Sequence, residues 1–398
     1  NVAIPIVVSR DRLGAGQAVA RLAGAAPVVP SWSKAVFIGG RQVPLPFERR
    51  ELTRMLPDGH KGRALRDWGR TRASIRSREL IGGGFEERSY RDWVVQRYGQ
   101  TAYDLLYAPY AAKRFGSPET ASVNLARLHH GLVDESPLVS LGSSPQQGFE
   151  RLMDGVDVRT EVSIEGLELH EGKVSRVLTD EGTIELDGRV FCAAPLPDLA
   201  EWLGDALSAH QRRDISQLDN RHRVQVALQL ADGSDLPAEL HVVDSAPFFR
   251  ITLPEFLPGG GELRGTVIAH LALGDDDGLW NSSDRRLVEE VVRAARTLGL
   301  SVSGRDARVQ RLPSHDPSWA SPMWYPIWVR VAAALDQLGI TLVGRAAAQR
   351  WSDAGALLLH AERVGRGAAD WHEQARLLLD PPVLIQDLDH TITRFVER

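Results

Sequence analysis

The chain has 398 residues, of which 43% are hydrophobic and 25% are charged, and its formal net charge is -5. This composition is typical of a folded globular protein, and the mildly acidic balance gives no reason to expect nucleic acid or an acidic membrane as a partner. A chain of this length exceeds what one hydrophobic core usually serves, so we expect two consecutive or interleaved domains.

Cysteine usage and the absence of targeting signals bear on where the protein works. No run reaches the roughly 20 apolar residues that a bilayer span requires, and no secretory leader opens the chain. The single cysteine, Cys192, rules out an internal disulfide and suits a reducing cytosol, so we expect a cytoplasmic protein. The first residue is Asn1 rather than methionine, which leaves room for a segment ahead of it.

Residues 1–30 predict a strand, a helix and a second strand. Within them, Gly14-Ala15-Gly16-Gln17-Ala18-Val19 is a near miss to the dinucleotide-binding fingerprint. That fingerprint needs a small residue where Val19 stands, and an acidic residue about 20 positions later to hold a ribose. The stretch from Val28 to Trp32 supplies no acid. We therefore interpret this region as an ordinary amphipathic helix between strands.

Residues 34–118 predict a hairpin followed by helices. Gly39-Gly40 forms a turn between two short apolar runs, and the Arg-rich stretch after it reads as the solvated surface of a helix. Ser89 and Asp92 have the spacing of a capping box that opens a helix. Pro109 is expected to kink or end that helix.

From Val156 the hydrophobic period changes to two, which indicates strands. A later amphipathic stretch predicts a helix at 283–298, and another helix is expected at 329–338. The expected strands are 156–162, 173–178, 183–186, 189–195, 224–230, 241–243 and 266–273.

Three blocks, taken in order, resemble one family. The first runs from Ser89-Tyr90-Arg91-Asp92-Trp93-Val94 through Ala108-Pro109-Tyr110 to Arg114-Phe115-Gly116. The second runs from Arg159-Thr160-Glu161-Val162 to Ala193-Ala194-Pro195-Leu196-Pro197, and the third is Leu342-Val343-Gly344-Arg345. Together they resemble bacterial flavoproteins of the protoporphyrinogen-oxidase and flavin-containing amine-oxidase superfamily, with UDP-galactopyranose mutases as more distant relatives.

The resemblance implies an α/β chain with an FAD/NAD(P)-binding, amine-oxidase-like fold, an inserted α+β substrate domain and an incomplete N-terminal βαβ unit. The discontinuous FAD-binding-like domain would comprise 1–40, 151–203 and 338–372. The substrate domain would have a helical part at 41–150 and a sheet part at 204–337, and 373–398 would be a C-terminal tail.

The resemblance also implies where FAD would bind. In the family, the segment matching Glu161-Val162 meets the adenosine end, and the loop matching Ala194-Pro195 runs close to the cofactor. The Gly344-Arg345 pair would approach the pyrophosphate and the flavin edge, where a guanidinium supplies bidentate charge for phosphate. Trp351 opens the next family segment and is counted with the cofactor-binding residues.

Several positions depart from the family pattern at the cofactor. Ala347 replaces a glycine, Gly355 stands where the family has a carboxylate, and Ala193-Ala194 replaces a polar pair. A Cβ at position 347 would crowd a backbone that should lie against the cofactor. Two explanations stay open: a flavoprotein whose early unit lies ahead of Asn1, or a descendant that has lost FAD and kept the scaffold.

Candidate substrate contacts are aromatic and basic groups of the inserted domain, since flavin takes the hydride in such enzymes and little acid–base chemistry is asked of the protein. Packing is the competing interpretation for the aromatic side chains, and an exposed loop is the competing one for the histidine. His129-His130 and Asp275-Asp276-Asp277 do not have metal-site spacing, so no metal is expected. The candidates are Tyr107, Tyr110, Arg114, His315, Trp319, Trp324 and Tyr325.

The sequence thus predicts an FAD-dependent oxidoreductase that acts on a small biosynthetic intermediate. One alternative is a flavin-free member of the fold that acts as an isomerase, a cyclase or a partner-binding scaffold. A further alternative is a nucleotide-sugar mutase. A small-molecule substrate is expected, and a protein partner is possible under the scaffold alternative.

Overall fold

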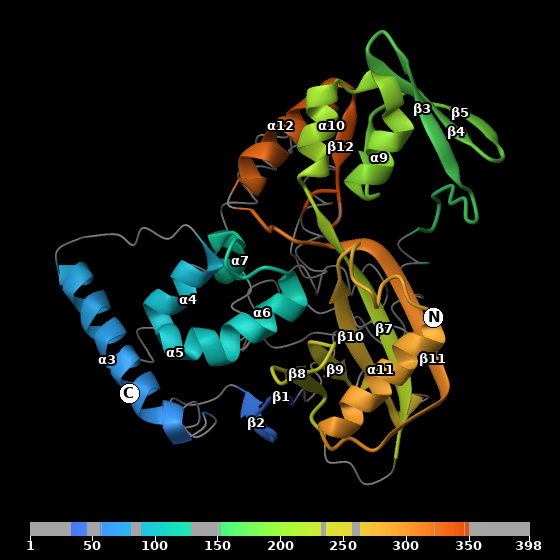
Figure 1. Ribbon diagram of the computed structural model, residues 1–398. Coiled ribbons are helices and arrows are strands. Elements are labelled where there is room, and N and C mark those ends of the chain that lie inside the picture. The colour runs from blue at the N-terminus through green and yellow to red at the C-terminus, as the bar shows by residue number, and fades with distance from the viewer. Residues whose placement is uncertain are drawn as a thin grey trace.

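A computed structural model describes residues 33–45, 56, 58–80, 89–128, 150, 153–231, 236–256, 263–321, 323–345 and 347–349. A large mixed sheet with helices on both faces forms one part, and a smaller group of strands and helices lies above it (Figure 1). The near-miss fingerprint at Gly14–Val19, together with Trp351 and Gly355, lies outside the described residues.

The large sheet has seven strands in the order β11-β7-β10-β9-β8-β1-β2. The hairpin of β1 and β2 turns at Gly39-Gly40 as predicted, and β1 joins the rest of the sheet by pairing parallel to β8. The pairings among β7 to β11 are antiparallel. The strands are β1 (Lys34–Ile38), β2 (Arg41–Leu45), β7 (Asn220–Leu230), β8 (Glu239–Val242), β9 (Arg250–Thr252), β10 (Thr266–Leu273) and β11 (Val302–Pro317).

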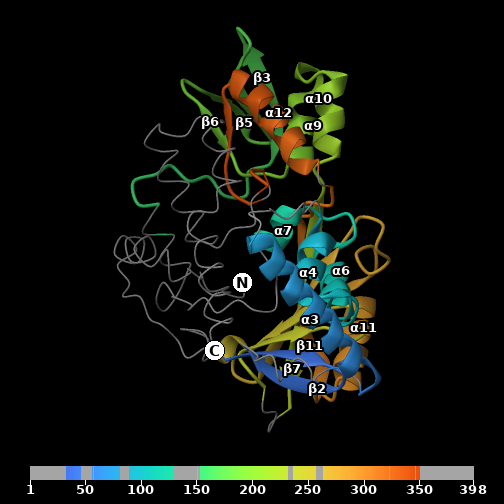
Figure 2. The same ribbon diagram turned by 90° about the vertical axis from the view of Figure 1, so that its left-hand side faces the viewer.

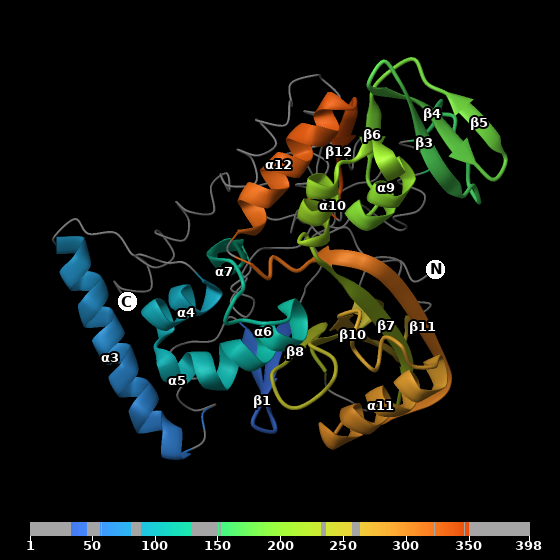
Figure 3. The same ribbon diagram turned by 45° about the horizontal axis from the view of Figure 1, so that its top comes forward.

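One face of this sheet packs against α11 (Asp284–Thr297) (Figure 3). Ser283 caps the helix by accepting a hydrogen bond from the main-chain N–H of Arg286. Leu287 and Val291 lie in a buried cluster with Val224 and Val226 of β7. This face of the sheet is therefore an ordinary apolar core.

A group of helices lies on the opposite side (Figure 2), where α6 contacts β10 of the sheet and α3 packs against α4 and α5. The Ser89–Asp92 capping box is present, which confirms that prediction. The prediction for Pro109 is wrong, because the helix that Ser89 opens ends earlier, at Tyr98. Pro109 lies in the first turn of α6, directly after a π-helical turn, where a missing N–H is tolerated. The helices are α3 (Asp58–Leu80), α4 (Tyr90–Tyr98), α5 (Gln100–Ala102), η2 (Tyr103–Tyr107), α6 (Ala108–Phe115) and α7 (Val123–Leu128).

The smaller part is built around β6 (Val190–Cys192) and β12 (Ile340–Leu342), which pair in parallel. The helix α12 (Trp324–Gln337) leads into β12, and its buried side chains share a core with Cys192 and Leu196. An antiparallel sheet, in the order β3-β4-β5, lies beside them (Figure 1). The remaining elements are β3 (Ile164–His170), β4 (Lys173–Thr179), β5 (Gly182–Glu185), α9 (Leu196–Leu203), η3 (Gly204–Ala206), α10 (Ala209–Ser216) and η4 (Pro254–Phe256).

A further sequence-based expectation, for residues 156–162, differs from the structure. The strand expected at 156–162 is absent, and this part of the chain is exposed irregular backbone that precedes β3. Its alternating valines include Val156, which is 57% exposed, so the alternation does not mark a buried face here. Residues 34–38, assigned by resemblance to the cofactor-binding part, form β1, which pairs with β8 of the large sheet. Among the described helices, none is both long and apolar enough to cross a bilayer.

Candidate functional site

The carboxyl ends of β6 and β12 lie side by side. Because the strands are parallel, the segments that follow them leave the sheet at the same edge, where ligands of α/β folds usually bind. The N–H of Val343 donates to the carbonyl of Cys192 at 2.9 Å. A Cβ on Gly344 would meet the Cβ of Ala193 at 3.5 Å, so the two predicted cofactor segments are in contact.

Gly344 and Ala347 bear on whether this edge fits FAD. Gly344 has a φ of 78°, in the left-handed region that glycine tolerates best, and it places Arg345 directly beyond the strand. Ala347 is fully buried in the core cluster that also contains Leu342. The core therefore accommodates the methyl group that replaces the family's glycine. The edge fits a cofactor held by main-chain groups and by Arg345.

Arg345 lies in a buried ion cluster that joins the two parts of the molecule. Its Nη1 donates to Oδ1 of Asp316 at 3.1 Å, and Nη2 of Arg223 donates to Oδ2 of the same carboxylate. Asp316 ends β11 and is completely buried. Burial alone would raise the pKa of Asp316, but Arg223 and Arg345 outweigh it and hold the pKa well below its usual range. Asp316 is therefore an anion that ties the β12 segment to the large sheet.

A row of polar side chains crosses the face of the large sheet that is turned away from α11. Direct cross-strand pairing places two residues on the same face of a sheet. The pairs Gln310 with Gln225, Gln225 with His270, His270 with Arg250 and Arg250 with His241 form one continuous row over β11, β7, β10, β9 and β8.

Several atoms of this row are buried without a protein partner. Within the described residues, no hydrogen-bond partner lies near Oε1 of Gln225, Nδ1 of His270 or Nε of Arg250. Arg223 lies two residues before Gln225 in β7, on the same face, and its Nε also lacks a partner there. An unsatisfied buried polar atom costs about 1–3 kcal/mol, so a group of them points to a bound polar molecule or to water.

Guanidinium groups crowd around one aromatic ring at this place. The central guanidinium carbons of Arg223, Arg114 and Arg250 lie 5.2, 5.6 and 5.8 Å from the ring centroid of Phe249. Among the described residues, Asp316 pairs with Arg223, and Glu239 pairs with Arg250 at 3.2 Å. The surface formed by the polar row and these arginines, which we call the arginine face, brings together three guanidinium groups, and guanidinium is a group that binds carboxylates and phosphates.

Tyr110 of α6 is tied to the arginine face through a histidine. Its hydroxyl lies 2.7 Å from Nδ1 of His241, whose Nε2 lies 3.1 Å from Oε1 of Glu239. Burial would raise the pKa of Glu239, but Arg250 and His241 hold it well below its usual range, and burial lowers the pKa of His241. The carboxylate thus accepts from Nε2–H, and the Tyr110 hydroxyl donates to Nδ1. Arg114 donates to the Tyr110 oxygen at 3.3 Å.

The other candidate residues lie in different settings. Glu161 is exposed and Val162 half-buried before β3, and Ala194-Pro195 follows β6. Tyr107 is buried and stacks on Tyr98 at 4.9 Å. The structure therefore does not bring Tyr107 to the arginine face.

The predicted aromatic group packs inside the core. Trp319 and Trp324 are buried and stack on each other, with centroids 4.2 Å apart, and Tyr325 lies edge-on to Trp324. The indole of Trp319 donates to the carbonyl of Gln349 at 3.0 Å. His315 is partly exposed beside Asp316, and burial lowers its pKa to about 4.

Sequence reasoning missed most of the arginine face. The alternation of Arg221, Arg223 and Gln225 with Val224 and Val226 in β7 was the available signal. Such alternation normally indicates a strand with one solvent-exposed face. Only the position of α6 shows that this polar face of the sheet is covered. In the part of the chain that the structure describes, no three His, Cys, Asp or Glu side chains group as a metal site would.

Solved structures match nearly the whole chain, although neither a scan of protein-family models nor a search of curated proteins found a match. A reduced UDP-galactopyranose mutase superposes with a TM-score of 0.73 at 13% identity, over 97% of this chain and 86% of that one. A protoporphyrinogen-oxidase-like protein from Exiguobacterium sp. 255-15 gives 0.64 at 16% identity, over 92% and 87%. A putrescine oxidase bound to putrescine gives 0.56 at 14% identity, over 91% and 87%. The likeness confirms the expected fold class.

Proposed function

We propose, for a chain with the fold of the FAD-dependent amine oxidase superfamily, that it is an FAD-dependent oxidoreductase whose small-molecule substrate carries an anionic group. The observation that carries the proposal is the arginine face, where buried guanidinium and amide atoms lack protein partners among the described residues. An anion there would accept hydrogen bonds from Nε of Arg223 and Nε of Arg250.

The residues that would hold the cofactor are those at the carboxyl edge of β6 and β12. Main-chain groups around Ala194-Pro195 and the turn at Gly344 would lie against FAD, and Arg345 would supply charge. When bound, FAD accepts a hydride from the substrate. Asp316 would fix Arg345 relative to Arg223, so the cofactor edge and the arginine face would move as one body.

The experiment is anaerobic reduction of the purified flavoprotein by a panel of small amines, alcohols and acids, each with and without a carboxylate or phosphate. The proposal predicts that bleaching of the flavin absorbance is restricted to anionic members of the panel. Equal bleaching by neutral analogues would contradict the proposal that the arginine face binds an anionic group of the substrate.

A nucleotide-sugar mutase is the second candidate. The TM-score of 0.73 to a reduced UDP-galactopyranose mutase favours it, and a diphosphate would suit the guanidinium groups around Phe249. Calorimetry with UDP separates the two candidates. Tight UDP binding without net flavin reduction supports the mutase, and no UDP binding removes it.

A flavin-free role is the remaining alternative. Gly355, where the family pattern has a carboxylate, favours it. If the protein has lost FAD, replacing Gly355 with aspartate leaves its native activity unchanged, and a strong gain of flavin-dependent turnover counts against this alternative.

A further inference from the structure

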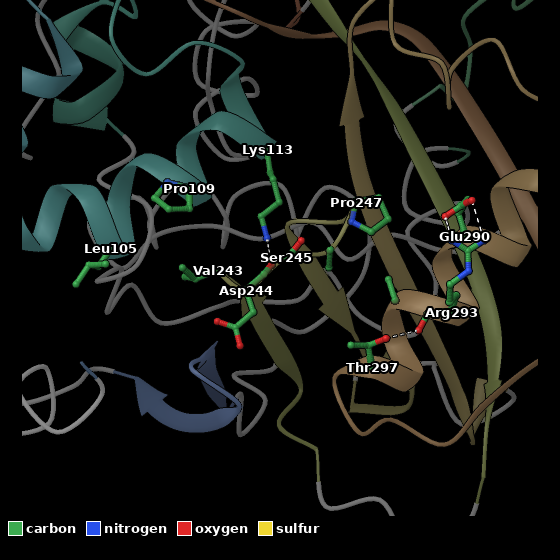
Figure 4. Close-up of a pocket in the computed structure, with 12 residues that line it drawn as sticks. Leu105, Pro109, Lys113, Val243, Asp244, Ser245, Pro247, Glu290, Arg293 and Thr297 are labelled. Atoms are coloured by element: carbon green, nitrogen blue, oxygen red, sulfur yellow. Dashed lines mark hydrogen bonds and ion pairs between the residues drawn. The ribbon is translucent and has the colours of Figure 1, made fainter. Parts of the chain in front are cut away.

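A groove separate from the arginine face lies between α6 and α11 (Figure 4). Its volume is about 840 Å³. Leu105 and Pro109 line one side, residues 243–247 of the loop after β8 form the floor, and α11 contributes the other side. The α11 residues are Glu290, Arg293, Ala294 and Thr297.

Lys113 places its amine in this groove. From the last turn of α6, its Nζ donates to the carbonyl of Asp244 at 2.9 Å and to the carbonyl of Val242. A neutral amine has two hydrogens, which these two carbonyls take up, and one lone pair. The lysine is thus held in place without using the electron pair that makes an amine nucleophilic.

The surroundings of Lys113 disfavour its charge. Burial lowers the pKa of Lys113 to about 7, and the Asp244 carboxylate opposes only part of that shift. That carboxylate accepts hydrogen bonds from the N–H groups of Gly39 and Gly40, at 2.7 and 2.9 Å, in the β1–β2 turn. The charge of Asp244 is therefore already stabilised by main-chain donors.

We propose that Lys113 is a carbonyl-reactive amine and that the groove takes a small aldehyde or ketone. The amine nitrogen adds to the carbonyl carbon, and an amine hydrogen passes to the oxygen to give a carbinolamine. Loss of water then leaves an imine, so no oxidant or other reactant is needed. Ser245 lines the groove, and its hydroxyl can donate a hydrogen bond to the carbonyl oxygen.

The composition of the chain makes the reaction measurable. The chain has four lysines, namely Lys34, Lys61, Lys113 and Lys173, and Lys173 is exposed. The test treats the full-length protein at pH 7.5 with propanal and cyanoborohydride, which traps the imine as a stable amine. Peptide mass spectrometry then gives the rate at each lysine. Lys113 is expected to react at least ten times faster than Lys173.

Two pairs of variants assign the reaction to the amine and to the groove. Lys113→Arg should abolish the fast modification while keeping donors for both carbonyls, and Lys173→Arg should leave it unchanged. Thr297→Trp, which fills the groove from an exposed position, should slow labelling of Lys113 at least fivefold. Arg285→Trp on the same helix, where the Arg285 side chain is 90% exposed, should not.

The pH profile gives an independent readout. The labelling rate of Lys113 should level off above about pH 8, because its amine is by then mostly unprotonated. A rate at Lys113 equal to or below that at Lys173, or a profile that keeps rising to pH 9.5, overturns the proposal. Because the groove is separate from the arginine face, either outcome leaves the proposed function untouched.

Discussion

Asp316 at the end of β11 accepts a hydrogen bond from Arg223 of β7, and both side chains are buried in the sheet face that α6 covers. The same carboxylate accepts from Arg345, which follows β12. One anion therefore connects the proposed cofactor edge with the proposed substrate surface. Removing its charge would leave Arg223 as a buried cation without its counter-ion.

Asp316→Asn is therefore expected to lower the free energy of unfolding by about 3 kcal/mol or more, the usual cost of breaking a buried ion pair on one side. Urea unfolding followed by circular dichroism measures the change. Asp284 is the matched control, because it pairs with Arg311 but is 63% exposed. Asp284→Asn should cost under about 1 kcal/mol. A loss for Asp316→Asn as small as that of the control contradicts the role assigned to Asp316.

Anion binding should depend on the arginine face. The double variant Arg250→Gln with Glu239→Gln removes one guanidinium of the face together with its carboxylate partner. Neither member of this pair is then left as a buried charge without its counter-ion. Calorimetry should show pyrophosphate affinity at least tenfold weaker than in the parent. The exposed pair on α11 gives the control, Arg285→Gln with Glu289→Gln, which should bind pyrophosphate as the parent does. Unchanged affinity in the first variant would show that the anion sits elsewhere.

Stability should fall as the pH drops below about 6.5. Burial lowers the pKa of His270 and of His241 in the folded state, so both stay neutral there while the unfolded chain takes up protons. Their contribution is fully present above the unfolded pKa and is lost as the pH falls towards the folded pKa, at about 1.4 kcal/mol per pH unit for each group.

Urea unfolding at pH 7.5 and pH 5.5 measures this loss of stability. His270→Gln should lose less stability between the two pH values than the parent does, whatever its stability at pH 7.5. His170 is exposed at the end of β3, and His170→Gln should show the parental loss. If both variants lose the same stability between the two pH values, burial of His270 does not lower its pKa as described.

Gly344→Ala tests the turn after β12. A side chain at a φ of 78° is strained, and the new Cβ would lie against the Cβ of Ala193. We expect a loss of about 1 kcal/mol in unfolding free energy and weaker FAD binding. Gly278→Ala is the control, because its Cβ would meet nothing within 4 Å. If Gly344→Ala binds FAD like this control, the backbone at Gly344 is not part of the cofactor edge.

The fold could be predicted from short ordered motifs, because the capping box at Ser89, the strand before Ala193 and the Gly344-Arg345 turn each depend on local sequence. The arginine face could not. Gln225 and His270 are far apart in sequence, and only the strand register places them opposite each other. Local pattern can also mislead. The valines within 156–162 alternate with polar residues, yet this segment is not a strand.

The most direct measurement is titration of the flavin-stripped full-length protein with FAD, followed by quenching of flavin fluorescence and by the visible spectrum. The account predicts saturation at one FAD per chain, with a spectral shift that pyrophosphate or an anionic substrate perturbs. Absence of saturable binding, in a protein that is folded by circular dichroism, would contradict the proposed function and leave the flavin-free scaffold as the better explanation.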